Sequence, residues 1–505
     1  MKKLFTLIIA AFAMPFLNAQ DITDALRYSQ QDILGTARYR GMSGAFGALG
    51  GDLSALQINP AGSAVFLNSY GSVTLSTNRI DNDALYFSNF RNRTSRNLNF
   101  GQLGAVFIFN NTDPEAPGVN KVSLGIAYDQ TTDNADKLFT AGRSSNSIDS
   151  FFINEAQGLP LGLISRASGE SIDGHYSFLG ETEGYRAQQA FLGYESFIVE
   201  PTDDSDLNGT TYTSNIGAGV YDQEYSYEST GINGKLTINA GAQINKDFYV
   251  GANLSSHFIN YDKVSEFFEG NNNATSNINE VLFTNRLSTI GGGFSAQIGG
   301  IAKVSKMVRV GASFESPTWY YIREETSQRL ETFSDADGRT IVNPDVINIF
   351  PEYRLRTPGK ATGSIAFLFE KQGLISIDYS YKDYTTTKLS SDEGADFSAL
   401  NTEIDTNLQG ASTIRIGTEW RNGNWSFRGG YSFEESPYKN TAILDDKTGY
   451  SIGGGYNFGK YKFDVTYNQT SQQRSETFYP NSGFGNTALI DTETHSLTFT
   501  LGMNF

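Results

Sequence analysis

The feature that most constrains this chain is a two-residue alternation of apolar and polar side chains, which recurs from residue 70 to the last residue. In one such segment, Leu236, Ile238 and Ala240 alternate with Thr237 and Asn239. Successive side chains of a β-strand point to opposite faces, so a period of two predicts strands with one apolar and one polar face. The sequence therefore predicts an all-β fold.

Fourteen segments follow this period: 70–80, 98–110, 121–131, 232–245, 248–261, 281–302, 307–330, 351–369, 374–389, 411–420, 425–438, 449–458, 461–470 and 495–505. The connections after even-numbered segments are mostly tight, whereas those after odd-numbered segments are long. Short turns at one rim and long loops at the other are typical of transmembrane β-barrels. The alternative, a row of soluble β-sandwiches, gives no reason for this asymmetry. We predict a transmembrane antiparallel β-barrel of about 14 strands.

The composition agrees with a barrel, because 52 glycines, 36 phenylalanines and 27 tyrosines accompany only 12 prolines. Barrels place aromatic residues at both membrane interfaces and alternate apolar with polar residues along each strand. A net charge of −17 argues against nucleic-acid binding, and the absence of cysteine excludes disulfides and thiolate metal sites. TonB-driven receptors have 22 strands, so this chain is too short to belong to that class of transporter.

The first 19 residues are predicted to be a secretory signal peptide, cleaved after Ala19. Met1-Lys2-Lys3 is basic, and the apolar run that follows ends near Leu17. This run is shorter than the ~20 residues of a membrane-spanning helix, which makes the alternative of a membrane anchor weaker.

A compact plug is predicted for residues 20–68, before the barrel of residues 69–505. Residues 21–28 are predicted to form a short helix capped by Asp21 or Thr23. The stretch 40–62 then contains six glycines, which allow close approach of one backbone to another. It ends in the turn signal Asn59-Pro60-Ala61-Gly62.

Several polar side chains are predicted to face the lumen from the phase of their strands: Tyr249, Asn253, Ser255, His257, Arg415, Glu419 and Arg428. They form either a polar conduit with contacts to the plug, or the paired polar groups that any barrel interior needs. The three histidines are scattered, so neither a metal site nor a haem with His175 as its ligand is favoured. No Gly-x-Ser-x-Gly turn is present, and we expect neither an enzyme, for which His257 would be the candidate, nor a cofactor.

The long loop 132–231 contains apolar residues in an otherwise polar extracellular segment. Phe139, Phe151, Phe152 and Leu161 are candidates for a groove that binds hydrophobic ligands, and the alternative is a loop that packs on itself. Asp204, Asp206 and Asn208 match the first half of a calcium loop. Asn215 stands where a bidentate Glu is expected, so an acidic surface turn is the alternative.

The plug, about 14 strands, the Asn59-Pro60-Ala61 turn before the first strand and the terminal Phe505 together resemble the FadL/TodX family of outer-membrane transporters. The motif runs from Gly44 through Asp52 to Gly62. The resemblance implies a monomeric barrel closed by an N-terminal hatch, to which Asn59, Pro60 and Ala61 belong. The loop 132–231 departs from the family, so its binding surface need not match.

The same resemblance implies passive uptake of hydrophobic small molecules, such as long-chain fatty acids, across a bilayer of lipid and lipopolysaccharide. Ligands would leave sideways through a gap in the wall, and Gly104 and Gly125 are candidates for where the wall thins. Phe505 looks like the signal read by the outer-membrane assembly machinery. Because related folds also serve secretion machinery, a scaffold that binds a protein partner is the alternative function.

Overall fold

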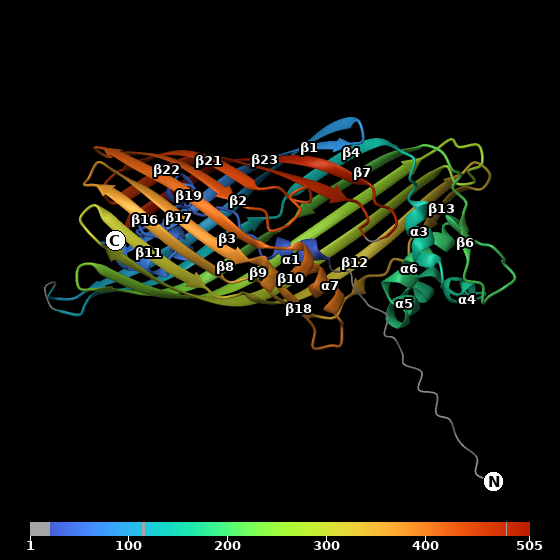
Figure 1. Ribbon diagram of the computed structural model, residues 1–505, viewed down its shortest axis with the longest axis horizontal. Coiled ribbons are helices and arrows are strands. Elements are labelled where there is room, and N and C mark those ends of the chain that lie inside the picture. The colour runs from blue at the N-terminus through green and yellow to red at the C-terminus, as the bar shows by residue number, and fades with distance from the viewer. Residues whose placement is uncertain (1–20, 114–116, 481) are drawn as a thin grey trace, which may run out of the picture.

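The structure is a computed structural model that describes residues 21–113, 117–480 and 482–505, so the predicted signal peptide lies outside the described residues. It is a closed antiparallel barrel (Figure 1), because β1 pairs with both β2 and β23. The strands around the wall are β1 (Tyr70–Tyr86), β2 (Asn89–Asn110), β3 (Val119–Asp133), β8 (Ile232–Ile244), β9 (Phe248–Gly270), β10 (Glu280–Lys303), β11 (Val308–Glu315), β16 (Lys360–Phe369), β17 (Gly373–Asp383), β19 (Gly410–Asn422), β20 (Trp425–Glu434), β21 (Lys447–Asn457), β22 (Tyr461–Thr477) and β23 (Thr487–Asn504).

Each of the fourteen predicted segments corresponds to one position in this wall, which confirms the predicted fold class. Among the described residues, none of the helices has the length and apolarity needed to cross a membrane. The tight connections lie at one rim together with the C-terminus, at the left of Figure 1. This short-turn rim is the one that we expect to face the periplasm.

Three predicted strands are interrupted. The segment 307–330 is divided into β11 and β12 (Trp319–Ser334), and the segment 351–369 into β15 (Tyr353–Arg356) and β16. Each break contains a proline, Pro317 or Pro358, which has no N–H to donate to the ladder. In the neighbouring wall position, β17 ends before the turn η3 (Tyr384–Thr386) and the short strand β18 (Lys388–Ser390).

The long loops contain more structure than the sequence predicted. The region 81–97 continues β1 and β2 into a hairpin, and the loop 132–231 begins with β4 (Asp136–Ser144) and ends with β7 (Tyr221–Thr230), which extend β3 and β8. Between them lies a lid, residues 145–220, whose apolar residues form one buried cluster with wall residues such as Phe267, Phe283 and Leu330. Its elements are α3 (Asp149–Ala156), α4 (Leu161–Ile164), α5 (Ile172–Thr182), α6 (Tyr185–Glu195), β5 (Val199–Pro201) and β6 (Tyr212–Ser214). Other outer loops contain β13 (Gly338–Val342), β14 (Asn348–Ile349) and α7 (Ser398–Asn407).

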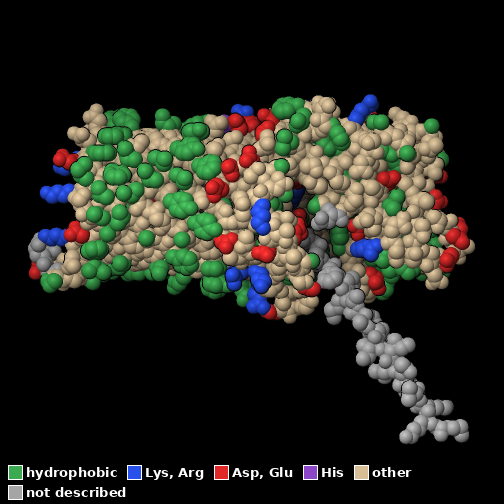
Figure 2. All heavy atoms as spheres, in the orientation of Figure 1, with side chains coloured by type: hydrophobic (Ala, Val, Ile, Leu, Met, Phe, Trp, Pro, Cys, Tyr) green, Lys and Arg blue, Asp and Glu red, His purple; other side chains and the backbone are tan. Residues whose placement is uncertain are grey.

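An apolar band covers the outside of the barrel next to the short-turn rim. Figure 2 shows hydrophobic side chains gathered over this half, with charged side chains at the rim and beyond the band. On β9 the band runs from Phe248 to Phe258, about ten residues or ~33 Å along the strand, which gives ~25 Å of height at a tilt of ~40°. Stacked rings mark its outer edge at Phe100, Tyr128 and Phe258 and its inner edge at Phe369 and Trp420. These rings correspond to the two aromatic girdles of a membrane barrel.

The segment before β1, residues 21–69, lies inside the barrel, where Figure 1 shows it in blue; we call it the hatch. Its elements are α1 (Ile22–Arg27), α2 (Ala37–Arg40), η1 (Ser54–Gln57) and η2 (Pro60–Val65). Asp21 caps α1 by accepting from the Thr23 and Asp24 amides, which confirms the predicted helix and its cap. The apolar residues of α1 pack above the rest of the hatch against Ile322, Leu355 and Ile404.

Candidate functional site

One side of the hatch is joined to the wall by hydrogen bonds between neutral amides and backbone carbonyls. The Asn59 side chain caps η2 by accepting from the Ala61 amide, and it donates to the carbonyls of Gly47 (2.7 Å) and Gly300 (3.0 Å). From the wall, further amides donate to hatch carbonyls: Asn253 to Leu56 (2.8 Å), Asn239 to Pro60 (3.0 Å) and Gln297 to Ile58 (3.0 Å). These bonds fix the turn that contains the predicted Asn-Pro-Ala motif.

Glycines line the wall where the hatch touches it, and we call them the glycine belt: Gly241, Gly251, Gly299, Gly311, Gly417 and Gly430. A methyl group on Gly251 would lie 2.5 Å from the Pro60 carbonyl carbon, and one on Gly430 would lie 2.6 Å from the Met42 carbonyl carbon. Within the hatch, Gly50 has a φ of +61° and contacts Gly62 backbone to backbone. Only glycine allows backbones to approach this closely.

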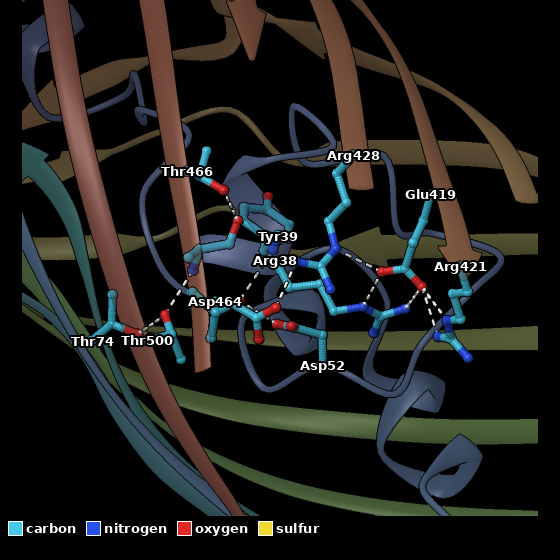
Figure 3. A network of polar contacts seen from close by, with 12 residues as sticks. Arg38, Tyr39, Asp52, Thr74, Glu419, Arg421, Arg428, Asp464, Thr466 and Thr500 are labelled. Carbon is cyan, nitrogen blue, oxygen red and sulfur yellow. Dashed lines mark hydrogen bonds and ion pairs between the residues drawn. The ribbon is translucent and has the colours of Figure 1, made fainter. Parts of the chain in front are cut away.

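The opposite side of the hatch is held by an ionic cluster (Figure 3). Arg38 of α2 makes two bonds to Glu419 of β19, at 2.8 and 3.2 Å. The same carboxylate accepts from Arg421 (2.6 Å) and Arg428 (2.7 Å), and Arg428 also pairs with Asp464 at 2.6 Å. The planar guanidinium group of arginine can donate two parallel hydrogen bonds to a carboxylate. A buried carboxylate offsets the cost of its desolvation only when it is fully paired in this way.

Single hydroxyl groups also hold α2. The Ala37 amide donates to the Thr500 hydroxyl (2.7 Å), and the Thr466 hydroxyl donates to the Ala37 carbonyl (2.6 Å). Asp52 lies behind α2 and accepts from the Thr36 hydroxyl and the Ser54 amide, so it joins the start of α2 to η1. The role of Asp52 and Gly62 as part of a hatch motif stays a prediction.

The predicted inward-facing residues do face the lumen. Tyr249, Asn253, Ser255 and His257 are all buried, and so are Glu419 and Arg428. Asn253 and Glu419 contact the hatch, whereas His257 bonds only to the wall residues Ser295 and Tyr320. Sequence reasoning missed Arg38 and Asp464, although the inward phase of the segment 461–470 could have indicated Asp464.

The predicted ligand residues lie mostly in the buried cluster that the lid forms with the barrel wall. Phe151, Phe152 and Leu161 belong to one buried cluster, and Phe139 is half-buried on β4. A role in ligand binding stays a prediction. Asp204, Asp206 and Asn208 form an exposed turn, and in the described part of the chain no three His, Asp or Glu side chains gather as a metal site.

The wall contains a seam between β2 and β3. Gly104 and Gly125 lie within the paired region, opposite Ala127 and Val106, and their predicted role in an opening stays a prediction. The ladder ends at Gln102 and Asp129, and no backbone bond joins residues 89–101 to β3 or β4, all of which the structure describes. Side chains bridge the seam instead: Asp133 accepts from Asn78, Asn97 and Asn99 at 2.6–2.7 Å.

A cavity of about 190 Å³, the outer chamber, lies on the lid side of α2 and reaches this seam. Asn78, Asp133 and Asp136 line it next to the seam, and Ile33, Leu34 and Ile80 contribute apolar surface. The charged residues Asp32, Arg40, Glu434 and Lys447 and several hydroxyl and amide side chains also line it. The chamber therefore connects the lumen above the hatch with the seam between β2 and β3.

No protein-family model matches this sequence, and no curated protein matches it. Solved structures do resemble it. A FadL homologue from Pseudomonas aeruginosa has 11% identity and a TM-score of 0.54, over 94% of this chain and 100% of its own. The toluene transporter TodX of P. putida has 13% identity and a TM-score of 0.52, over 94% of this chain and 99% of its own. At these identities the likeness concerns the fold, and the chain thus has the fold of the FadL and TodX outer-membrane barrels, as its sequence motifs indicated.

Proposed function

We propose that this protein is an outer-membrane channel for passive uptake of hydrophobic small molecules, such as long-chain fatty acids. The observation that carries the proposal is the seam between β2 and β3 beside the outer chamber. Each neighbouring pair among the fourteen wall strands shares a backbone ladder, but the ladder of β2 and β3 stops at Gln102 and Asp129, although β2 begins at Asn89. A ligand in the chamber has a sideways path there that breaks no backbone hydrogen bond.

The surroundings of the seam suit a lipophile that passes into the bilayer. Leu98, Phe100 and Leu103 of β2 are exposed on its outer side, next to the outer aromatic edge of the band. The amides and carboxylate that bridge the seam belong to flexible side chains, which can separate at a lower cost than a ladder. The hatch fills the lumen below, so a ligand is directed sideways. TodX, which has the same fold, is a toluene transporter, and this supports a hydrophobic ligand here.

The first test is mass spectrometry of organic extracts from the purified, detergent-solubilised protein. A bound fatty acid or aromatic compound near one-to-one ratio, lost when the lid is shortened, is the expected result. The proposal is contradicted if the purified protein contains no hydrophobic ligand and is instead bound to a protein partner in stoichiometric amount. That result would favour a surface scaffold, for which the exposed Phe178, Phe197 and Leu207 of the lid offer contacts.

The second test closes the seam chemically, because the chain has no native cysteine. Asn97→Cys with Asp133→Cys places two thiols across the seam, and a short bifunctional thiol reagent joins them. Uptake of oleate and toluene by cells that express the channel should fall after treatment. The control pair, Gln473→Cys with Asp491→Cys, lies on the laddered strands β22 and β23, and its cross-link should leave uptake unchanged.

A further inference from the structure

A second cavity, the inner chamber, lies on the other side of α2. It has a volume of about 520 Å³ and extends to the short-turn rim at Asn68, Lys371 and Asn457. Its charged lining is dense: Arg38, Asp52, Arg309, Glu370, Lys371, Glu419, Arg421, Arg428, Lys462 and Asp464. Polar cavities of this size hold many water molecules. The inner chamber is thus a water-filled vestibule on the side from which the tight turns project.

Only a thin partition separates the two chambers. On β22, Asn468 lines the outer chamber and Asp464 the inner one, and Thr466 stands alone between them. On β20, Ser432 and Arg428 line the two chambers, with Gly430 between. On β23 the same relation holds for Ser496, Thr498 and Thr500. The partition is therefore one inward-facing residue deep on each of these strands, together with α2, which contacts them.

The hatch is attached unequally on its two sides. The η1–η2 side lies against the glycines of the belt on β8 to β11 and is bonded there through its backbone carbonyls, whereas Gly417 and Gly430 of the belt contact Met42 just after α2. The α2 side depends on ion pairs, on hydroxyl bonds to Ala37, and on one bond from Arg40 to Asn468 (3.1 Å). The outer chamber lies on one side of α2 and the inner chamber on the other, whereas η2 borders the inner chamber alone, at Val65. Movement of the hatch should therefore occur at α2.

We propose that α2 is the gate of a polar route for small hydrated ions, which runs between the two chambers along the inner faces of β19 to β23. If α2 moves away from the wall by about the length of one side chain, the two chambers join. The wall residues behind α2 are glycine and threonine, whose small side chains do not fill the space that α2 leaves. The inward-facing residues of β19 to β23 along the route are polar or charged, whereas the apolar surface of Ile33, Leu34 and Ile80 lies on the other side of the outer chamber. The strand face therefore suits ions rather than lipophiles. It is independent of the seam and of the proposed uptake of hydrophobic molecules.

Two engineered disulfides distinguish the sides of the hatch. Ser43 and Ser451 have hydroxyl oxygens 2.9 Å apart, and a cysteine pair there joins the segment after α2 to β21. Ser63 and Ser123 are equally close, at 2.8 Å, and a pair there joins η2 to β3. Both spacings suit a disulfide, and gel mobility under oxidising conditions verifies each bond.

The measurement is single-channel conductance in planar bilayers with potassium chloride. We expect discrete conductance steps from the reduced Ser43→Cys/Ser451→Cys protein, their loss on oxidation and their return on reduction. The oxidised Ser63→Cys/Ser123→Cys protein should keep the steps. The proposal is overturned if the steps survive the first disulfide or disappear with the second.

A charge variant tests the gate without a covalent bond. Arg38→Gln removes the ion pair between α2 and the wall, while Glu419 keeps Arg421 and Arg428 as partners. The open fraction should rise several-fold. Arg421→Gln removes a bond to the same carboxylate but leaves α2 attached, so its open fraction should match the wild type. The proposal is also overturned if neither the wild type nor Arg38→Gln shows conductance steps. Retention of a hydrophobic ligand, measured on the same proteins, tests the proposed hydrophobic uptake and not the ion route.

Discussion

At the scale of single residues, Asn59 combines roles that its sequence motif only partly indicates. Its carboxamide oxygen caps η2, and its nitrogen donates to one carbonyl of the hatch and to two of the wall. Asn59→Ala leaves these groups buried without partners, which costs about 1–3 kcal/mol for each unsatisfied group. We expect a lower unfolding temperature in detergent, followed by heat-dependent mobility on gels. Asn68→Ala, at an exposed position of the same segment, should unfold like the wild type.

Glu269 is a buried carboxyl group in the outer part of the barrel, eleven positions beyond the apolar band on β9. It accepts hydrogen bonds from the Ser147 hydroxyl, the Ile148 amide and the Gln223 side chain, all neutral donors. Burial raises the pKa of Glu269 from its ordinary value of 4.5 to about 7, and the nearby Asp149 carboxylate adds to the rise. The start of the lid is therefore bonded to a carboxyl group that titrates near neutral pH.

This shift predicts a pH dependence of the lid. Because the folded pKa lies above the unfolded one, the stabilising effect is complete below pH 4.5 and is lost as the pH rises towards 7. Between pH 5.5 and 8.5 the loss amounts to about 2 kcal/mol. The protection of residues 147–164 from hydrogen exchange, relative to the intrinsic rate at each pH, should be lower at pH 8.5, and Glu269→Gln should remove most of this difference. Glu224→Gln, an exposed change on β7, should retain it.

At the scale of elements, the glycine belt explains how a hatch can fit inside a barrel of this width. A methyl group on Gly311 would overlap the Gly47 carbonyl, which belongs to backbone and cannot turn aside. Gly311→Ala should therefore destabilise the barrel by about 1–3 kcal/mol or displace the hatch, because overpacking forces the backbone to move. Gly363→Ala on the neighbouring β16 has open space around the new methyl group. Urea unfolding of the two variants measures the difference, and equal stabilities would show that the hatch adjusts freely.

The elements differ in how far the sequence could predict them. Strands in the apolar band were found because lipid on one side and polar lumen on the other impose a strict alternation. Their outer ends were missed, since residues 91–97 of β2 are polar on both faces where water replaces lipid. The lid helices were also missed, although Ala187, Ala190 and Phe191 of α6 repeat at helical spacing and are buried. That pattern was a usable signal.

The candidate site was less predictable than the fold, because its partners are distant in sequence. Alternation placed Glu419 and Arg428 in the lumen but could not join them to Arg38, which precedes Glu419 by 381 residues. The seam was equally hidden, since Asn97, Asn99 and Asp133 lie outside or at the ends of the predicted strands. Pairing between strands is a property of the closed barrel, and no local pattern reports it.

At the scale of the whole molecule, the positions of the three tryptophans indicate where the membrane lies. Trp420 and Trp425 face outward beside one tight turn, and Trp319 faces outward at the opposite edge of the apolar band, stacked on Phe294 at 5.1 Å. All three are at least 38% exposed, so lipids reach them. In membrane barrels, tryptophan rings lie at the two membrane interfaces. We therefore expect that none of the three rings lies at the centre of the bilayer.

Brominated lipids test this placement in reconstituted vesicles. Bromines near the headgroups should quench the tryptophan fluorescence more strongly than bromines near the chain ends. In Trp319→Phe the same ranking should remain, because the two rings at the inner edge are still interfacial. A lumen control, Tyr249→Trp with the three native tryptophans changed to phenylalanine, places the ring behind the wall, where Tyr249 is 4% exposed, and should show no lipid quenching. Stronger quenching by deep bromines would move the membrane away from the apolar band, and with it the seam that the proposed exit of hydrophobic ligands requires.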